Sequence, residues 1–594
     1  MRHLNASIML RNRHTERLLN ALIWCCLTIG LAFLLVLATA FKAQAQWPIN
    51  PANPLPICND ASSQKNLGIV SDGQGGYITL WTDNRLAADR YAIFGQRITA
   101  QGDLLWESNG RLLREVPGRS INTYGAARMS NNNFMIAYSS GLGQFTADTL
   151  YAMAFDVDGQ PVWAQPTLLA QPGMLPGTGT ANGHWYPRMA QVLNGIFIGW
   201  GTNPIGAADY VHIARVLNDG TNLMPVQGVE VTTMNNSIVT GPWTFRHDLN
   251  GGLMLEERWG NGSGAPLYAM RVDSMGAQLW PALLQVSANS MGLSYEWTTA
   301  VAPTSRVNSI WGYGYDLRMS IYDTTGVLQN SGAPIDVCIH PDVQENPFVV
   351  QTADESTVFW SDNRTSAGNG RQVFMQRFDA QGNALLTANG VLAMQMNGNL
   401  IGFPRAIAVG GGTHIVTMFS GVDQLGGTGG FRAGRITNTG TNLWSDTTIF
   451  AIPSKGPNGG SAYGIVPDGS GGAIAVWFNW EDDAIYTARI ASDGRLGPDD
   501  NTAIAERDGD DALRAYPNPA NDQVTIAFDT PFAGGSAVVE LIDATGRTIR
   551  AERIAAYSAS HTMALSPELA DGQNKERPKN PGATPRPARV MVER

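Results

Sequence analysis

Two short segments carry the same set of side chains that could bind a carbohydrate. Trp81, Asp83, Asn84 and Arg85 recur in the same order as Trp360, Asp362, Asn363 and Arg364. An indole face stacks on a sugar ring, while carboxylate, amide and guanidinium groups hydrogen-bond to its hydroxyls. The same residues also stabilise a turn after a strand, because aspartate caps backbone N–H groups and arginine pairs with it. Two copies favour this structural role, since a single binding site does not need the same corner twice.

Carboxylates that could hydrolyse a glycosidic bond lie outside any recognisable motif. Glycoside hydrolysis needs two acid groups across a sugar, and Glu256, Glu257, Asp316 and Glu345 are the available candidates. The sialidase turn Ser-x-Asp-x-Gly-x-x-Trp is not matched, because Asp72 comes one position early. We therefore assign no catalytic residue and favour a non-enzymatic protein, with a divergent glycan-cleaving hydrolase as the alternative.

The sequence contains no motif that predicts a metal or a cofactor. His184, His212, His247, His340 and His414 are widely separated and have none of the short spacings of metal-binding histidines. The acidic segment 508–511 lacks the alternating ligands and closing glutamate of a calcium loop. Phosphate-loop and dinucleotide-binding fingerprints are also absent. We expect neither a metal nor a cofactor.

The candidate side chains belong to a repeated unit. A turn followed by a Leu/Trp-type segment recurs along the chain, as in residues 101–106 and 439–444. Its glycines are Gly102, Gly159, Gly220, Gly276, Gly326, Gly382, Gly440 and Gly494, separated by 57, 61, 56, 50, 56, 58 and 54 residues. A nearly constant period indicates that one structural unit is repeated.

Each repeat contains about four predicted strands. A glycine-rich turn precedes an alternating strand, as in residues 71–81 and 467–477, and a second strand precedes the Leu/Trp turn. Four-stranded units with a period near 50 residues are typical of propeller blades. We therefore predict an all-β protein in which residues 46–505 form an eight-bladed β-propeller, or a seven-bladed one with a divergent unit.

The C-terminal region carries a second pattern. Tyr516, Pro517, Asn518 and Pro519 precede alternating runs at 523–528 and 537–542, and Gly546 and Arg547 follow in a turn. The region resembles the type A C-terminal sorting domain of type IX secretion substrates. Over residues 513–572, the resemblance implies a small Ig-like β-sandwich, a Bacteroidetes-like source, export across the outer membrane, and the type IX secretion machinery as a partner.

The last residues depart from that family. Members end in an aromatic-rich strand and a final strand, whereas residues 573–594 are basic and contain Pro578, Pro581, Pro585 and Pro587. Proline removes a ladder donor and is disfavoured inside strands. We therefore predict an incomplete sorting domain followed by a disordered basic tail, produced by divergence or by a frameshift.

The N-terminal residues indicate export. Four arginines precede an apolar run at about 21–41, and Ala43 and Ala45 form a small-x-small pattern before Gln46. We predict a signal peptide over residues 1–45. An uncleaved membrane anchor is the alternative, because the apolar run approaches the roughly 20 residues that span a bilayer.

Composition limits the partners. Removing residues 1–45 takes away five Lys/Arg and one Glu, so the formal charge changes from −10 to −10 − 5 + 1 = −14. A basic face for nucleic acid is therefore not expected. Cys58 and Cys338 remain after cleavage, and their pairing stays open.

Together these features predict a secreted or cell-surface protein with a non-catalytic propeller that binds glycans or proteins. An acidic linker at 506–512 joins the propeller to the sorting domain. Contact with a membrane is expected only through the signal or anchor segment.

Overall fold

In the computed structural model, the chain divides into two units, Met1–Pro498 and Asp499–Arg594. The structure describes residues 47–50, 53–143, 146, 148–172, 181–204, 210–233, 244–258, 266–287, 297–301, 306–330, 333–352, 355–364, 371–395, 404–420, 430–444, 448–451, 463–479 and 482–497, and in the second unit 513–516, 523–528, 537–542, 548–554, 560–564, 574–579 and 588–590. The predicted cleavage residues Ala43, Ala45 and Gln46 and the linker 506–512 lie outside these residues. Across the described ranges, no helix has the length and apolar character needed to cross a membrane.

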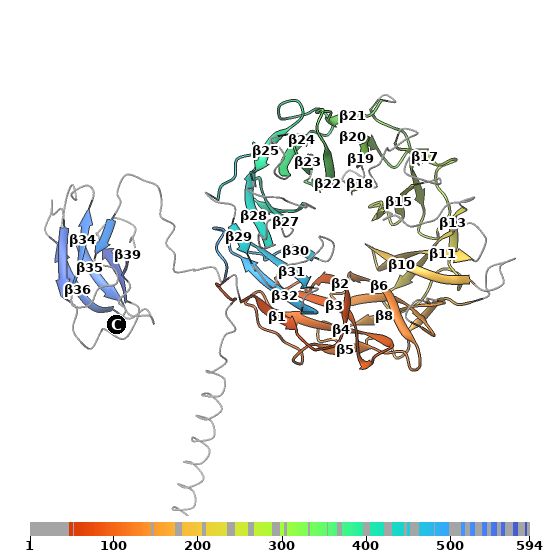
Figure 1. Ribbon diagram of the computed structural model, residues 1–594, viewed down its shortest axis with the longest axis horizontal. Helices are drawn as coiled ribbons and strands as arrows, with labels where there is room; N and C mark the ends of the chain where they lie inside the picture. Colours follow the sequence, from red (N-terminus) through yellow and green to blue (C-terminus); the bar gives the residue numbers. More distant parts are fainter. Residues whose placement is uncertain are drawn as a thin grey trace, which may run out of the picture. The chain divides into compact units, whose positions relative to one another are not determined.

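The first unit is an eight-bladed β-propeller, which confirms the prediction of eight blades (Figure 1). Each blade is a four-stranded antiparallel sheet whose first strand is innermost. Blade 1 consists of β2(Gln64–Ser71), β3(Tyr77–Ala87), β4(Arg90–Ile98) and β5(Arg111–Arg114), and blade 2 of β6(Ser120–Arg128), β7(Phe134–Gly141), β8(Thr149–Phe155) and β9(Thr167–Ala170). Blade 3 consists of β10(Ala181–Val192), β11(Gly195–Pro204), β12(Tyr210–Leu217) and β13(Val229–Thr233). Blade 4 consists of β14(Thr244–His247), β15(Leu253–Arg258), β16(Leu267–Val272) and β17(Leu284–Gln285).

Blades 5 to 7 repeat this order, and blade 8 differs because its outer strand comes from the N-terminal part of the chain. Blade 5 consists of β18(Trp297–Val301), β19(Val307–Tyr313), β20(Asp316–Tyr322) and β21(Ile335–Cys338), and blade 6 of β22(Gln344–Gln351), β23(Ser356–Asp362), β24(Gln372–Phe378) and β25(Val391–Met394). Blade 7 consists of β26(Arg405–Gly410), β27(Thr413–Ser420), β28(Gly430–Thr437) and β29(Thr448–Ala451). Blade 8 consists of β30(Tyr463–Pro467), β31(Ala473–Asn479) and β32(Ala484–Ile490), with β1(Leu55–Cys58) as its outer strand.

The ring closes through the N-terminal segment. β1 pairs antiparallel with β32, with Leu55 opposite Thr487. Trp47 is buried, and its Nε1 donates to the carbonyl of Ala100 in blade 1 at 2.8 Å. Because blade 8 takes its outer strand from the start of the chain, residues more than 400 positions apart in sequence hold the ring together.

The Leu/Trp turns found in the sequence connect neighbouring blades. Trp163 Nε1 donates to the carbonyl of Asn218 at 3.0 Å, and its indole ring packs on Gly220 of the next blade. Trp280 makes the same two contacts with Thr324 and Gly326. The glycine has a positive φ and a bare Cα in each case, so both the turn and the ring contact require glycine. The repeat therefore encodes the interface between blades as well as the blade itself.

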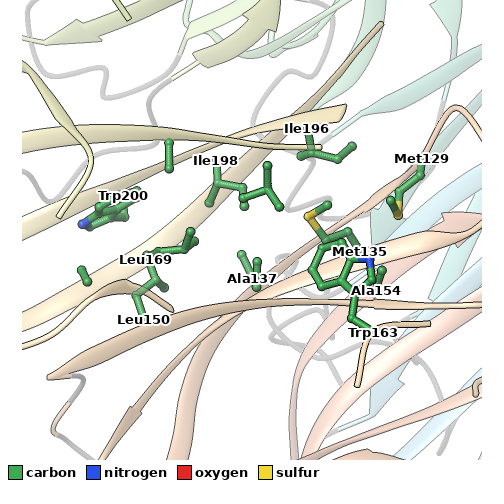
Figure 2. Close-up of a cluster of buried hydrophobic side chains, with 14 residues drawn as sticks. Met129, Met135, Ala137, Leu150, Ala154, Trp163, Leu169, Ile196, Ile198 and Trp200 are labelled. Atoms are coloured by element: carbon green, nitrogen blue, oxygen red, sulfur yellow. The ribbon is translucent and has the colours of Figure 1, made fainter. Parts of the chain in front are cut away.

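The core lies between the blades. Figure 2 shows one such cluster, in which Met135 and Leu150 of blade 2 pack with Ile196, Ile198 and Trp200 of blade 3. Strand residues that alternate in direction bury both sheet faces against adjacent blades, so few positions are left for charged groups. This packing explains the 15% charged composition.

The second unit is a small β-sandwich with one feature that the sequence analysis missed. One sheet has the order β33(Leu513–Tyr516), β34(Gln523–Phe528), β37(Ser560–Ala564), and the other β36(Thr548–Ile554), β35(Ala537–Ile542), β38(Asn574–Lys579), β39(Ala588–Val590).

The prediction of a disordered tail after residue 572 is therefore wrong at two places, because β38 and β39 lie within it. β38 pairs along one edge of β35, and Pro578 lies opposite Val539. Among the described residues of the second unit, β39 pairs with Asn574, Lys575 and Glu576 of β38 and with no residue at Pro578. Proline is tolerated at such an edge, and the open edge of β35 supplies hydrogen bonds that local composition does not predict.

Candidate functional site

The first predicted corner lies near the end of β3. Trp81 and Asp83 are fully buried, and Trp81 Nε1 donates to Asp83 Oδ2 at 3.2 Å. Arg85 donates to the same oxygen from Nε at 3.0 Å and from Nη2 at 2.5 Å, and its backbone N–H binds Oδ1 at 2.8 Å. Burial by itself would raise the pKa of Asp83, but hydrogen bonds from Arg85 and Ser62 outweigh it and keep this pKa below its usual value.

The second corner has the same geometry in blade 6. Trp360 Nε1 donates to Asp362 Oδ2 at 2.9 Å, and Arg364 binds that oxygen from Nε at 3.0 Å and Nη2 at 2.5 Å. The guanidinium carbon of Arg364 lies 4.1 Å from the centroid of the Phe374 ring, and Arg85 lies 4.1 Å from that of Phe94. The two corners are thus copies of one packed arrangement.

The asparagines of both corners bind backbone atoms. Asn84 Oδ1 accepts the backbone N–H of Ser63 at 2.9 Å, and its Nδ2 donates to the carbonyl of Ala88 at 3.0 Å. Asn363 Oδ1 accepts the backbone N–H of Val343 at 2.9 Å. These side chains hold the preceding loop against the strand end, as expected for turn residues.

Each corner also joins two blades. Arg85 Nη2 lies 3.2 Å from the Sγ of Cys58, at the end of the outer strand of blade 8, and Arg364 Nη2 lies 2.9 Å from the Sγ of Cys338 in blade 5. Both cysteines are free and buried, so they form no disulfide with each other. Burial raises the pKa of both thiols, so they are protonated at neutral pH.

The two corners do not form one site. They occupy blades 1 and 6, with blades 7 and 8 between them on one side of the ring. Their aspartates are enclosed, and their arginines bond to those aspartates. The geometry supports the structural role of these residues, because their main polar groups already have partners inside the protein.

The candidate carboxylates are dispersed and engaged. Glu256 is buried and accepts hydrogen bonds from Thr299 Oγ1 at 2.5 Å, Tyr322 Oη at 2.6 Å and Ser309 Oγ at 3.1 Å, all in blade 5. Burial raises the pKa of Glu256 despite these bonds.

The other candidates have partners as well. Asp316 pairs with Arg318 at 3.0 Å, and Glu345 pairs with Arg371 at 2.6 Å. Glu257 is buried beside Glu256 in β15. The four carboxylates therefore lie in three blades. Glu256, Asp316 and Glu345 form hydrogen bonds or ion pairs within the protein.

Two histidines that are distant in sequence lie together. Thr202 Oγ1 is 3.1 Å from His184 Nδ1 and 3.3 Å from His212 Nδ1. Thr202 follows buried Trp200 by two residues, as Asp83 follows Trp81, so it replaces the corner aspartate in blade 3. Burial lowers the pKa of both histidines to about 4, so they are neutral at pH 7.

Within the part of the chain that the structure describes, no group of three or more histidine, cysteine or acidic side chains has a metal-binding arrangement.

Sequence reasoning missed a pair of arginines near the centre of the ring. Arg188 lies on β10 and Arg246 on β14, the innermost strands of adjacent blades 3 and 4, and both residues are exposed. Neither arginine lies in a motif that distinguishes it from the other polar residues on the strands. Periodicity alone therefore does not reveal them.

The C-terminal region matches a known family. Residues 514–572 match the secretion system C-terminal sorting domain, which confirms that the chain carries a type IX sorting domain and implies export to the cell surface or secretion. Tyr516 ends β33 and pairs with Thr525. The motif residues Pro517, Asn518, Pro519, Gly546 and Arg547 lie outside the described residues.

Solved structures share features with the chain only at low identity. Puromycin hydrolase is 14% identical with a TM-score of 0.36, over 73% of this chain and 60% of that protein. Prolyl oligopeptidase B from Galerina marginata is 9% identical with a TM-score of 0.37, over 74% and 55%. The α-L-arabinanase of Penicillium chrysogenum is 14% identical with a TM-score of 0.32, over 57% and 98%. No curated protein matches the chain.

Proposed function

We propose that the protein is a secreted or cell-surface binding protein, in which a non-catalytic propeller holds a glycan or protein ligand and the sorting domain delivers it through the type IX machinery. The match at residues 514–572 supports delivery. A propeller supports binding because its loops and central strands present many side chains around a rigid ring.

The candidate carboxylates form hydrogen bonds and ion pairs within the protein, and this observation favours a binding function over hydrolysis. A glycosidase keeps one carboxyl group free to protonate the leaving group and a second one free as base or nucleophile. Glu256 is enclosed by three hydroxyls of blade 5, and Asp316 and Glu345 pair with arginines. Asp83 and Asp362 are likewise buried in ion pairs.

A divergent glycan-cleaving hydrolase is the alternative, and one experiment separates the two. The exported protein is applied to a glycan array, and the bound glycans are then incubated with it in solution and analysed for cleavage. Binding without cleavage supports the proposal. Cleavage of a bound glycan overturns it and directs mutagenesis to Glu256 and Glu257.

A surface protein as the ligand is tested with the same material. Crosslinking of the exported protein on intact cells, followed by mass spectrometry, would detect a partner protein. If the array yields no glycan and crosslinking yields no protein, the binding function is wrong. The secretion machinery is an expected partner only during export, so it must be absent from the crosslinked complexes of the mature protein.

A further inference from the structure

The innermost strands of blades 3 and 4 carry two exposed arginines. β10 and β14 lie against each other, with Arg188 on the first and Arg246 on the second. First strands of blades surround the centre of the ring (Figure 1). The two guanidinium groups therefore lie on the part of the propeller where neighbouring blades come closest together.

Neither arginine forms an ion pair with an acidic side chain among the residues that the structure describes. Arginines on the third strands of blades differ: Arg97 pairs with Asp72 at 3.2 Å, and Arg271 pairs with Asp248 at 2.8 Å. Arg246 Nη1 donates a hydrogen bond to the carbonyl of the preceding residue, Phe245, at 3.3 Å. In a chain with a formal charge of −10, unneutralised positive groups at one place are unusual.

The carboxylate whose charge acts on Arg246 is committed elsewhere. Glu256 lies on β15 and accepts hydrogen bonds from Thr299, Ser309 and Tyr322 of blade 5. Glu256 occupies the fourth position of its strand, where blade 1 has Leu80 and blade 5 has Ile310. Its role is to fasten blade 4 to blade 5, and it leaves the guanidinium of Arg246 available.

The two positive charges repel each other in a partly desolvated place. Although part of each side chain is exposed, partial desolvation of the guanidinium groups lowers the pKa of Arg188 and of Arg246. The positive charge of Arg246 lowers the pKa of Arg188 further, and the charge of Glu256 partly offsets the shift at Arg246. A bound anion would offset both the repulsion between the two guanidinium groups and their desolvation, because it supplies a counter-charge. The surrounding protein has a low dielectric constant, which strengthens this attraction.

We propose that Arg188 and Arg246 bind the acid groups of a glycan, a carboxylate or a sulfate, at the centre of the ring. This proposal rests on the glycan-binding function proposed above and specifies its ligand class. The guanidinium fork matches both anions through paired N–H donors. The acidic chain repels partners of high negative charge density, whereas a glycan with isolated acid groups needs only a few cations. The observations therefore favour such a glycan over an acidic protein.

Calorimetry with matched oligosaccharides tests the proposal on the exported protein. The probes are an oligogalacturonate and its methyl ester, which share one backbone and differ in charge, and a sulfated galactan oligosaccharide with its desulfated form. We expect the acidic member of at least one pair to bind more tightly. R188Q and R246Q should each weaken that binding about tenfold, as expected for loss of a charge-assisted hydrogen bond.

R90Q is the control, because Arg90 carries the same charge and pairs with the exposed Asp89 at the β3–β4 turn. It should leave the affinity unchanged, and thermal unfolding should show that all three variants are folded. The pair of probes that responds distinguishes carboxylate from sulfate as the anion.

Four results would overturn the inference. Equal binding of the charged and neutral members of both pairs would do so while leaving the glycan-binding function intact. Unchanged affinity in the R188Q/R246Q double variant would exclude these arginines. Binding of a polyaspartate peptide with the same dependence on both arginines would assign the site to an acidic protein. If no probe binds and the array shows no neutral glycan, the glycan-binding function also fails.

Discussion

The indole ring of Trp47 packs on Gly102, and a Cβ atom at Gly102 would lie 3.0 Å from the ring carbon Cδ2. Trp106 and Trp163 make the same contact with Gly159 and Gly220 one and two blades further along the chain. Trp47 belongs to the N-terminal segment that completes blade 8, so it joins the last blade to the first. The ring is therefore closed by the same contact that joins its interior blades.

Trp47→Ala should destabilise the propeller by about 3–5 kcal/mol, the usual cost of removing a buried tryptophan, and should also release β1. Hydrogen exchange at residues 55–58 should become faster. Trp163→Ala is the control, since it removes an equivalent contact away from the closure and should leave exchange in β1 unchanged. Unaltered protection of β1 in Trp47→Ala would show that closure does not depend on this residue.

Gly110→Ala should destabilise more than Gly118→Ala. Both glycines have positive φ, of 89° and 73°, so both substitutions carry the backbone cost of about 1 kcal/mol. At Gly110 an added Cβ would also lie 2.3 Å from Cη2 of the buried Trp81, whereas nothing lies within 4 Å at Gly118. Urea denaturation should show an additional loss of about 1–3 kcal/mol for Gly110→Ala. Equal losses would mean that the Trp81 corner adapts to the methyl group.

Asp83→Asn should cost about 3–5 kcal/mol at pH 7, because it leaves the guanidinium of Arg85 without its buried counter-charge. The folded pKa of Asp83 is depressed, so the stabilisation is present above its unfolded value of about 3.9 and is lost as the pH falls through the folded value. Denaturation at pH 7 and at pH 3 should therefore show a smaller difference between wild type and variant at pH 3. Asp89→Asn, at an exposed aspartate, should show little difference at either pH.

Glu256→Gln should have the opposite pH dependence. Burial raises the folded pKa of Glu256, so its contribution is most favourable below the unfolded value of about 4.3 and is lost as the pH rises through the folded value. The stability of Glu256→Gln relative to wild type should therefore increase as the pH rises above about 4. Glu345→Gln, which changes a partly exposed ion pair, serves as the control. A difference that stays constant with pH would show that the pKa of Glu256 is the same in the folded and unfolded states.

Deleting residues 574–594 should abolish export. The deletion removes β38 and β39, and β35 then loses one of its two neighbouring strands. Secreted protein in the medium and on washed cells should fall to the level of a chain that lacks residues 513–594. Export at the wild-type level would show that β38 and β39 are dispensable and that the matched residues 514–572 suffice.

The propeller could be predicted from the repeat because each repeat is marked by residues that are close together in the sequence. Gly102 and its seven equivalents take positive φ in the structure, and each is followed by the segment that leads to the outer edge of a blade. The Trp81 and Trp360 corners were also predictable as turn structures, since Asp83 and Asp362 bind backbone groups two residues away. Such contacts depend on neighbouring residues, so the sequence shows them directly.

The sequence by itself determined the repeated four-stranded unit, the turn chemistry and the sorting domain, and the tertiary structure decided for eight blades over seven. The tertiary structure alone decided which distant side chains meet: Trp47 with Gly102 and Glu256 with Tyr322 across blades, and His184 with His212 on either side of Thr202 within blade 3. It also left Arg188 and Arg246 exposed at the innermost strands and paired β38 with β35. The physical reason is that burial and pairing depend on the strand packed alongside, which ring closure and sheet formation supply from distant parts of the chain.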